Sequence, residues 1–505
     1  MSTSSAYSND SEGPRFVIVG AGISGICLAI QLLKAGIRSV TILEKSEDMG
    51  GVWLDNTYPG CICDVPSILY SFSFYPKYDW SRKYAPQSEI LDYFKECADH
   101  FGVRDLIQFR TEVTRAVWDD DSATWNVETD TGESFTCDFF VSAVGQLSLV
   151  KMPNIEGSDS FEGPAFHSAR WNRDFDFRDR RVAVVGSAGS AIQIVPKLAE
   201  LARKVTLFQR SPNWILRRHD HRYPGWMKAF YRYVPFAGRI QRWAMYLLNE
   251  TRILFYNRRT QRNKILTFWA RLRMRQAPKH LHEQVIPTFP AAAKRVLISN
   301  DFLQSLHREN VSVVTESIER ITPNGIITSL GEEPVDAIVY ATGFESTKLL
   351  APMEILGRDG ISLNDSWGRR PHTYFGMLSP GFPNFFMLYG PNTNLGHNSI
   401  IFMVECQVRY ILRCLSLLRQ QNKEVIEVTR EATEQYDKGL QEHLREKVWN
   451  GYATNWYKTD QGDITNNWGR STLAYWRQTR VPDEKALRLS SRRAPATAER
   501  APVAH

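Results

Sequence analysis

Disulfide-forming cysteines, long apolar runs and a leader segment are all missing from this sequence. Its 505 residues include seven cysteines, an odd number at irregular spacing, which excludes a disulfide framework. Cys61 and Cys63 are one residue apart, so they lack the C-x-x-C spacing of a redox dithiol. No run of 18 apolar residues exists, and the polar start MSTSSAYSNDSEGP has no hydrophobic region, so neither a spanning helix nor a signal peptide is predicted. The expected location is cytoplasmic.

The composition is that of an ordinary globular protein, with 43% hydrophobic and 23% charged residues. Two or three domains are expected at this length. The net charge of +7 is unevenly spread. Residues 228–279 contain thirteen Lys or Arg and a single acid, Glu250, so this segment carries about +12 and the rest is slightly acidic. The basic character is therefore local, and no metal site is predicted.

A first nucleotide-binding signature lies near the N-terminus. The short β-branched run at 16–19 leads into Gly20, Gly22 and Gly25, the pattern G-x-G-x-x-G, which an apolar helix follows. The glycines permit a tight turn, close approach of a pyrophosphate and close helix packing. A second strand ends in Glu44, whose carboxylate suits a ribose diol. An N-terminal site of this kind, in a chain with a second one, usually holds FAD.

A second signature, RRVAVVGSAGSAIQ, repeats this architecture. Gly186, Ala188 and Ala191 occupy the three glycine positions, and alanine at the second one crowds a pyrophosphate. Gly189 beside it offers a shifted turn.

The strand after this loop ends in Gln209 where the first site has Glu44, so no carboxylate repels a 2′-phosphate. Arg210 and Ser211 follow, and an arginine fork suits phosphate oxygens. The second site therefore favours NADPH over NADH.

Between the two signatures lies F-E-G-P-A-F-H-S-A-R-W-N, residues 161–172. This string resembles the fingerprint of type I Baeyer–Villiger monooxygenases, flavoenzymes that use FAD, NADPH and O2. The family usually ends it with Pro or Asp, and this chain has Asn172. By resemblance, His167 and Trp171 couple coenzyme binding to domain movement.

Further segments carry the same resemblance. G-G-V-W…Y-P-G-C-I-C-D, ending at Asp64, is similar to the family segment whose aspartate orients an active-site arginine. The pair Lys294-Arg295 matches a family pair in which the lysine meets the coenzyme phosphate and the arginine is catalytic, although Ala291 to Ala293 depart from the usual Gly-Cys. The cofactor-binding residues predicted in this way are Gly20, Gly22, Gly25, Glu44, Gly51, Trp53, Asp64, Tyr70, Gly186, Ser187, Ser190, Arg210, Ser211, Lys294 and Asn392.

The resemblance implies insertion of one oxygen atom from O2 beside a ketone carbonyl through a C4a-peroxyflavin, giving an ester or lactone. Arg295 and Asp64 are the expected catalytic residues. A small lipophilic ketone is the expected substrate, and no nucleic-acid partner is expected. The alternatives are an N- or S-monooxygenase of the same superfamily, a pyridine-nucleotide disulfide reductase, and a non-catalytic nucleotide-binding protein. Trp468 is a candidate lid residue.

The expected fold is α/β, with two Rossmann-like dinucleotide-binding domains, for FAD and NADP, and a helical insertion. Within the insertion, Ile240, Trp243, Leu247 and Leu254 recur at helical spacing beside arginines. A helical insertion with a solvated basic face is favoured; a basic amphipathic element in peripheral contact with an anionic membrane is the alternative. The predicted divisions are a disordered start (1–14), an FAD domain (15–150 and 346–482), an NADP domain (151–218, with the fingerprint, and 281–345), the basic insertion (219–280) and a disordered tail (483–505).

Overall fold

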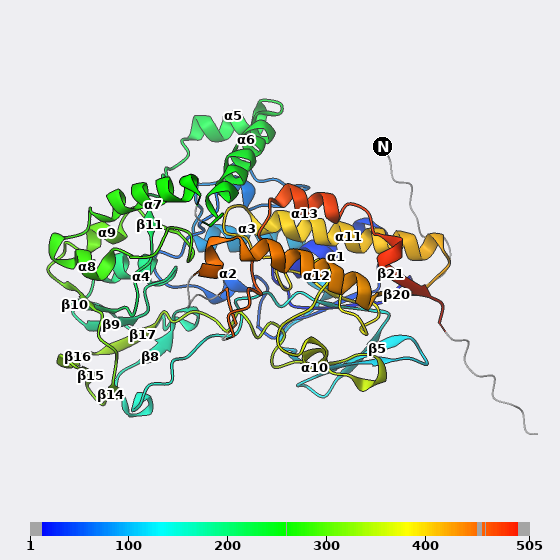
Figure 1. Ribbon diagram of the computed structural model, residues 1–505, viewed down its shortest axis with the longest axis horizontal. Helices are drawn as coiled ribbons and strands as arrows, with labels where there is room; N and C mark the ends of the chain where they lie inside the picture. The colour runs from blue at the N-terminus through cyan, green and yellow to red at the C-terminus, as the bar shows by residue number, and fades with distance from the viewer. Residues whose placement is uncertain (1–12, 259, 452–456, 460, 493–505) are drawn as a thin grey trace, which may run out of the picture.

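Two five-stranded parallel sheets, each with helices against it, lie side by side in the computed structural model of this protein (Figure 1). The structure describes residues 13–258, 260–451, 457–459 and 461–492. The predicted disordered start lies almost wholly outside these residues.

The first sheet has the order β19-β7-β1-β2-β3. Its strands are β1 (Phe16–Val19), β2 (Val40–Leu43), β3 (Ile107–Gln108), β7 (Phe139–Ser142) and β19 (Phe385–Met387). β1, β7 and β19 are buried along their whole length, as expected for a parallel sheet covered on both faces. β19 comes from the last third of the chain, so in the sequence the strands of the second sheet lie between β7 and β19.

Three helices pack together beside this sheet: α1 (Ile23–Lys34), α3 (Gln87–His100) and α11 (Ile400–Gln420). α1 contacts both α3 and α11. α1 begins directly after the glycine loop and has eight buried residues. The loop that would hold a nucleotide is therefore fixed between a buried strand and a buried helix.

The second sheet has the order β13-β10-β9-β17-β8. Its strands are β8 (Ala165–His167), β9 (Arg181–Val185), β10 (Lys204–Phe208), β13 (Val311–Val314) and β17 (Ala337–Tyr340). α4 (Ala191–Leu198) follows β9 and packs on the sheet. The fingerprint segment supplies the edge strand β8, which pairs with β17, so it is part of this sheet.

Smaller elements complete the fold. The remaining strands are β4 (Val113–Asp119), β5 (Thr124–Thr129), β6 (Ser134–Cys137), β11 (Ile215–Leu216), β12 (Leu297–Ile298), β14 (Arg320–Thr322), β15 (Gly325–Thr328), β16 (Gly331–Pro334), β18 (Glu354–Leu356), β20 (Val425–Val428) and β21 (Leu487–Ser490). The remaining helices outside the insertion are α2 (Val52–Asp55), α8 (His282–Val285), α9 (Phe302–Ser305), α10 (Leu363–Trp367), α12 (Arg430–Arg445) and α13 (Thr472–Gln478).

The basic segment forms α5 (Gly225–Tyr233), α6 (Ala237–Thr251) and α7 (Gln261–Met274). The helical spacing predicted from Ile240 to Leu254 is confirmed as far as Thr251, where α6 ends and a 3₁₀ helix (Arg252–Phe255) follows. α5 and α6 stand out above the body of the molecule (Figure 1). No helix within the described ranges is long and apolar enough to cross a membrane.

The tail departs from its prediction. Residues 483–505 were expected to be disordered, but β21 pairs antiparallel with β20 along four residue pairs. Leu487 and Ala486 are buried. The alternating residues of the LRLS strand place apolar side chains on the core, and this short pattern was too weak to recognise beside the polar residues that follow it. Residues 493–505 lie outside the described part.

Candidate functional site

The first glycine loop is shaped by close backbone approach. Gly20 has φ of +102°, and a Cβ there would lie 2.9 Å from Ala143 O. A Cβ on Gly25 would lie 2.0 Å from Gly20 O, so helix and loop can meet only without a side chain. Gly22 faces Gly51 from the next segment, because a Cβ on Gly51 would lie 3.3 Å from Gly22 Cα. Two stretches of bare backbone therefore border one space, as a pyrophosphate requires.

Glu44 stands at the end of β2 beside this loop. Its Oε2 accepts from Ala21 N at 2.7 Å, and its Oε1 accepts from Ser46 N at 2.8 Å. A carboxylate has about four acceptor positions, so two remain for hydroxyl donors. The loop and Glu44 together fit the pyrophosphate and ribose of a dinucleotide.

The second loop repeats this construction with one change. Gly186 has φ of +111°, and a Cβ there would lie 2.4 Å from Ala341 O. Ala188 is exposed, so its methyl group occupies the open side of the loop. A Cβ on Gly189 would meet no atom within 4 Å, so the fold does not require glycine there. Its bare backbone is free to face a ligand.

Three predicted residues gather next to this loop. Ser187 Oγ donates to Ser211 O at 3.0 Å, and Lys294 Nζ donates to Ser211 Oγ at 2.7 Å. Burial and then the neighbouring charge of Arg210 lower the pKa of Lys294. Two cations held together without a carboxylate between them form a site for an anion. Ser190 precedes α4 and lies beside Tyr58.

The predicted catalytic pair is in direct contact. Arg295 donates through Nη2 to Asp64 Oδ2 at 2.5 Å and through Nε to the same oxygen at 3.1 Å. Both side chains are half-buried. The charge of Asp64 raises the pKa of Arg295 well above its usual value. The guanidinium is therefore a permanent cation, with donors left over for a reacting group.

The insertion holds the segment that carries this arginine. On α7, Asn263 Nδ2 donates to Ala291 O at 2.8 Å, and Thr267 Oγ1 accepts from Ala291 N at 3.0 Å. Ala292 has φ of +69°, a conformation that disfavours alanine by about 1 kcal/mol. The departure from glycine noted in this segment thus leaves a strained backbone two residues before Lys294.

Three tyrosines, two of them buried, interact with the ion pair, and sequence reasoning missed all of them. Tyr256, Tyr389 and Tyr457 each interact with the charges of Arg295 and Asp64. Burial raises the pKa of Tyr256 to about 12, against the opposing charge of Arg295. The hydroxyls stay protonated at neutral pH. No motif marked them, because they come from three distant segments.

Two further predicted cofactor residues form a pair. Trp53 Nε1 donates to Tyr70 OH at 3.2 Å, and the rings meet edge to face. Both are buried next to the segment that ends in Asp64. Asn392 instead has its amide engaged, because Nδ2 donates to Ile464 O and Asn467 O. That side chain fixes the chain locally.

The prediction that Trp468 is a lid residue is wrong. Its side chain is 1% exposed, and its Nε1 donates to Ser471 O. The ring packs edge to face on Tyr475. It belongs to the core.

Sequence reasoning also missed Gln146, which lies beyond the end of β7. Its Nε2 donates to Tyr389 O and Gly390 O, both at 3.0 Å. Its Oε1 is buried without a hydrogen-bond partner among the described residues. This acceptor is one of several buried polar atoms without a partner among the described residues, and it is free to accept a hydrogen bond.

Two hydrogen bonds fix the fingerprint residue His167 at the end of β8. His167 Nδ1 accepts from Ala169 N at 3.1 Å, so its proton is on Nε2, which donates to Gly343 O at 2.9 Å. Gly343 O also accepts from Lys151 N, so this carbonyl ties together two crossing segments. Burial lowers the pKa of His167, so the ring is neutral.

The other fingerprint residue, Trp171, packs among aromatic rings. Its ring stacks on Phe177 with centroids 5.2 Å apart and meets Phe166 edge to face. The neighbouring Arg170 pairs with Asp55 of α2 at 2.9 Å, which connects the fingerprint to the first glycine site. Gln193 of α4 makes a second connection, because it accepts from Tyr58 OH at 3.2 Å.

The cysteines have no redox arrangement. All seven are free, and burial raises the pKa of Cys61 to about 12. A thiol that stays protonated is a poor nucleophile. This counts against the disulfide reductase alternative.

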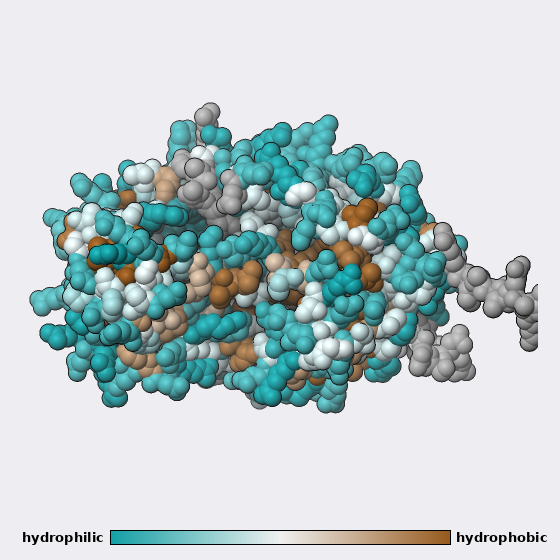
Figure 2. Space-filling view, turned by 90° about the horizontal axis from the view of Figure 1, so that it is seen from below, coloured by the Kyte–Doolittle hydropathy of each residue, from teal (hydrophilic) through white to brown (hydrophobic). Residues whose placement is uncertain are grey.

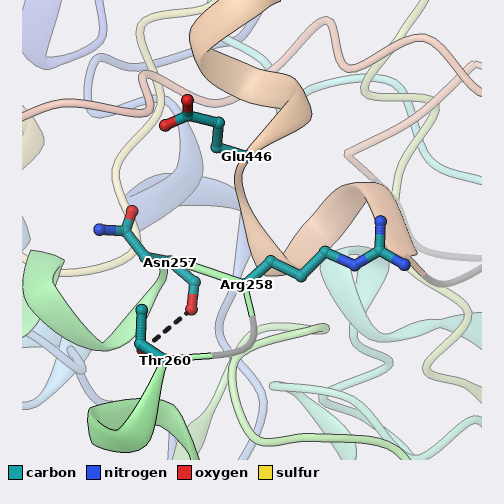
Figure 3. A pocket seen from close by; sticks show the side chains of 4 residues that line it. All are labelled: Asn257, Arg258, Thr260 and Glu446. Atoms are coloured by element: carbon teal, nitrogen blue, oxygen red, sulfur yellow. Dashed lines mark hydrogen bonds between the residues drawn. The ribbon is translucent and has the colours of Figure 1, made fainter.

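An open cavity of about 450 Å³ lies between the insertion and the end of α12. It is lined by Asn257, Arg258, Thr260 and Glu446, and Arg258 points away from Glu446 (Figure 3). None of the predicted site residues lines it, but Tyr256 of the tyrosine cluster is the neighbour of Asn257 in the sequence.

The surface seen from below is mostly hydrophilic, with hydrophobic side chains gathered in its middle (Figure 2).

Comparison with known proteins gives consistent matches. The model of a family described as flavin-binding monooxygenase-like matches residues 13–349. A Baeyer-Villiger monooxygenase of Pseudomonas aeruginosa is 35% identical over 94% of this chain and 92% of its own length. The FAD-binding monooxygenase ktnD of Aspergillus niger is 38% identical over 92% of this chain and 79% of its own. The crystal structure of OTEMO in complex with FAD and NADP superimposes with a TM-score of 0.86 at 27% identity, covering 95% of this chain and 100% of that one.

Proposed function

This chain belongs to the flavin-binding monooxygenase-like family as an FAD- and NADPH-dependent Baeyer–Villiger monooxygenase, and from this premise we propose that the ion pair of Arg295 and Asp64 is its oxygen-transfer centre. The observation that carries the proposal is the contact itself. Asp64 follows the first glycine site along the chain, and Arg295 follows Lys294, which reaches the second. The pair therefore lies where chemistry from both sites meets.

The reaction converts a ketone, O2, NADPH and a proton into an ester or lactone, NADP⁺ and water. FAD, when bound, accepts hydride from NADPH and activates O2. All other parts of the mechanism fall to the residues of the chain.

Binding is proposed to follow the two loops. The backbone of Gly22 and Gly51 would hold the pyrophosphate of FAD, and the Glu44 carboxylate would accept from its ribose. Lys294 and Arg210 hold the 2′-phosphate of NADPH, because they form the uncompensated pair of cations beside Ser211. The absence of a carboxylate at Gln209 removes the group that would repel that phosphate.

Arg295 stabilises negative charge as it develops on oxygen during attack on the ketone carbonyl and the rearrangement that follows. Its raised pKa means that it does so as a cation and gives up no proton. Asp64 accepts two hydrogen bonds from the Arg295 guanidinium. This contact sets the direction in which the remaining N–H donors of Arg295 point. Asp64 is thus the positioning residue.

His167 is proposed to couple the domains. It joins the fingerprint to Gly343 while Arg170 joins it to α2, so movement at the NADP site is transmitted to the flavin site. The division of the chain into split FAD and NADP domains and a basic insertion is proposed with the boundaries expected from the sequence. The substrate is proposed to be a small lipophilic ketone.

The test replaces each partner of the ion pair separately. Arg295→Ala should lower ester formation by about 10²- to 10³-fold, and Asp64→Asn by less. NADPH oxidation should continue in both variants and release hydrogen peroxide in place of ester. Product analysis on a ketone panel and a peroxide assay measure the two outputs.

Arg203→Ala, at an exposed arginine of the second domain, is the matched control. FAD content and melting temperature show whether each variant folds. Ester formation that survives in folded Arg295→Ala would overturn the assignment. Oxidation of sulfides or amines alone, with no ketone converted by the unaltered enzyme, would contradict the ketone substrate.

A further inference from the structure

Large hydrophobic side chains are concentrated on the outside of the insertion. Of twenty exposed large hydrophobic residues in the described chain, fourteen lie within 226–272. The expectation of a solvated basic face is therefore incomplete, because the apolar stripe of this segment is exposed as well. Isolated exposed apolar residues are normal, but a cluster of this size indicates a surface that another body covers.

The exposed residues form stripes along helices in contact. On α5, Trp226 is 69% and Tyr233 is 74% exposed, and their spacing of seven residues places them on the same face of the helix. The stripe of α6 follows the same rule and consists of Phe236, Ile240, Trp243 and Leu247, each at least 59% exposed. α5 packs against α6, and both rise above the body of the molecule (Figure 1). Together they make one projecting apolar ridge, called here the α5–α6 ridge.

Basic side chains border the ridge. The Arg239 guanidinium lies 6.0 Å from the centre of the Phe236 ring, and that of Arg232 lies 5.6 Å from the Tyr233 ring. The one acid of residues 228–279, Glu250, is turned inward, where it accepts from Asn398 Nδ2 at 2.8 Å and Thr472 Oγ1 at 2.6 Å. The outer surface therefore combines exposed aromatic rings with cations and has no carboxylate of its own segment to neutralise them.

The opposite face of α6 is held firmly. Arg242 donates to Ser71 Oγ and to Ser71 O, both at 2.9 Å. Tyr246 OH lies 2.8 Å from Thr472 Oγ1. The ridge is therefore a fixed projection. Ser71 follows Tyr70 in the chain, so these hydrogen bonds anchor α6 on the segment that continues from Asp64.

We propose that the α5–α6 ridge docks the enzyme on the surface of an anionic lipid bilayer. Aromatic rings at the headgroup level and cations against anionic lipids are the two contributions that bind interfacial helices. A second copy of the chain is a poorer occupant, because a symmetric dimer would bring two basic ridges together. The docked enzyme would take up ketones dissolved in the bilayer. This last point rests on the proposed function, whereas the docking does not.

The test is flotation of the full FAD-loaded chain with vesicles. Phosphatidylcholine vesicles serve as the neutral surface, and phosphatidylcholine mixed with phosphatidylglycerol serves as the anionic one. The enzyme should float with the anionic vesicles only. Trp226→Ser combined with Trp243→Ser should weaken binding by about tenfold or more. Arg232→Gln combined with Arg239→Gln should weaken it about 25-fold, since each cation near the surface contributes about fivefold.

Matched controls replace exposed residues elsewhere. Leu330→Ser with Val481→Ser removes two apolar side chains that are 73% and 67% exposed. Arg203→Gln with Arg308→Gln removes two exposed charges. Both controls should bind like the unaltered enzyme, and all variants should keep activity on a water-soluble ketone.

Four results would overturn the proposal. These are no binding to either vesicle, equal binding to both, a self-association that the tryptophan variant abolishes while vesicles are ignored, and retention on duplex DNA without vesicle binding. Because flotation needs no turnover, a failed docking test leaves the role of Arg295 untouched, and an inactive enzyme can still be tested for docking.

Discussion

Lys294 and Arg295 are consecutive in the chain, yet their side chains reach the two halves of the site. Lys294 Nζ lies 2.7 Å from Ser211 Oγ at the second glycine loop, and Arg295 Nη2 lies 2.5 Å from Asp64 Oδ2 beyond the first. The two side chains thus leave one short segment before β12 (Leu297–Ile298) toward different partners. The residues proposed for coenzyme binding and for oxygen transfer are thus joined by a single peptide bond.

Removing the cations at the second site should change coenzyme preference. Arg210→Ala and Lys294→Ala should each raise the KM for NADPH by about tenfold to a hundredfold, since a charged hydrogen bond contributes roughly 1.5–3 kcal/mol. The KM for NADH should change little, because NADH lacks the 2′-phosphate. Steady-state kinetics with both coenzymes measure the effect, and Arg203→Ala is the control. An equal loss with NADH would place these cations elsewhere.

Two alanine substitutions in the first loop should have different consequences. At Gly25 a Cβ would lie 2.0 Å from Gly20 O, so Gly25→Ala should lower the melting temperature even without FAD. At Gly22 the nearest atom is Gly51 Cα at 3.8 Å, an ordinary contact, so Gly22→Ala should fold but lose flavin. Calorimetry of apoprotein and the flavin-to-protein absorbance ratio distinguish them. A Gly22→Ala enzyme with full FAD content would contradict the loop assignment.

The alanine at the second loop should weaken coenzyme binding measurably. Ala188→Gly removes an exposed methyl group from the side of the loop that faces the proposed pyrophosphate. We expect the KM for NADPH to fall several-fold with little change in kcat. Gly189→Ala is the companion variant, because a Cβ there meets no atom within 4 Å and should not disturb folding. A higher KM in this companion would show that bare backbone at Gly189 compensates for Ala188.

Stability should depend on pH through His167. Burial lowers the pKa of His167 from its usual 6.5, so the unfolded chain takes up a proton first as the pH falls. The stabilising contribution is present above about pH 6.5 and is lost as the pH falls toward the lowered pKa. His167→Gln keeps a donor for Gly343 O but cannot titrate. Its melting temperature should therefore fall less than that of the unaltered protein between about pH 7.5 and about pH 5.5.

The controls are two other histidines. His443 donates to Gly469 O, and burial lowers its pKa in the same direction, so His443→Gln should add to the effect. His280 is exposed, and His280→Gln should leave the pH dependence unchanged. Identical pH dependence in His167→Gln and the unaltered protein would contradict the neutral assignment.

Local backbone requirements were determined by the sequence alone. Glycine spacing, the strand before it and the acid after it specify a dinucleotide loop because the steric demands lie within a few residues. The same holds for the exchange of Glu44 for Gln209 and for the helical spacing of residues 240–251. FAD, NADPH and the family followed from these patterns together with the fingerprint.

Tertiary structure decided everything that depends on which surfaces meet. Arg295 contacts Asp64, which lies 231 positions away in the sequence. Tyr256, Tyr389 and Tyr457 interact with this pair from three separate segments. Periodicity showed that α6 has an apolar face but could not show which side packs, and in the fold the residues of this face are exposed. Conversely, Trp468 was expected to be a lid residue and β21 to be disordered, but both are part of the core. Hydrophobic pattern records a tendency to leave water, whereas burial depends on a partner surface that only the assembled fold supplies.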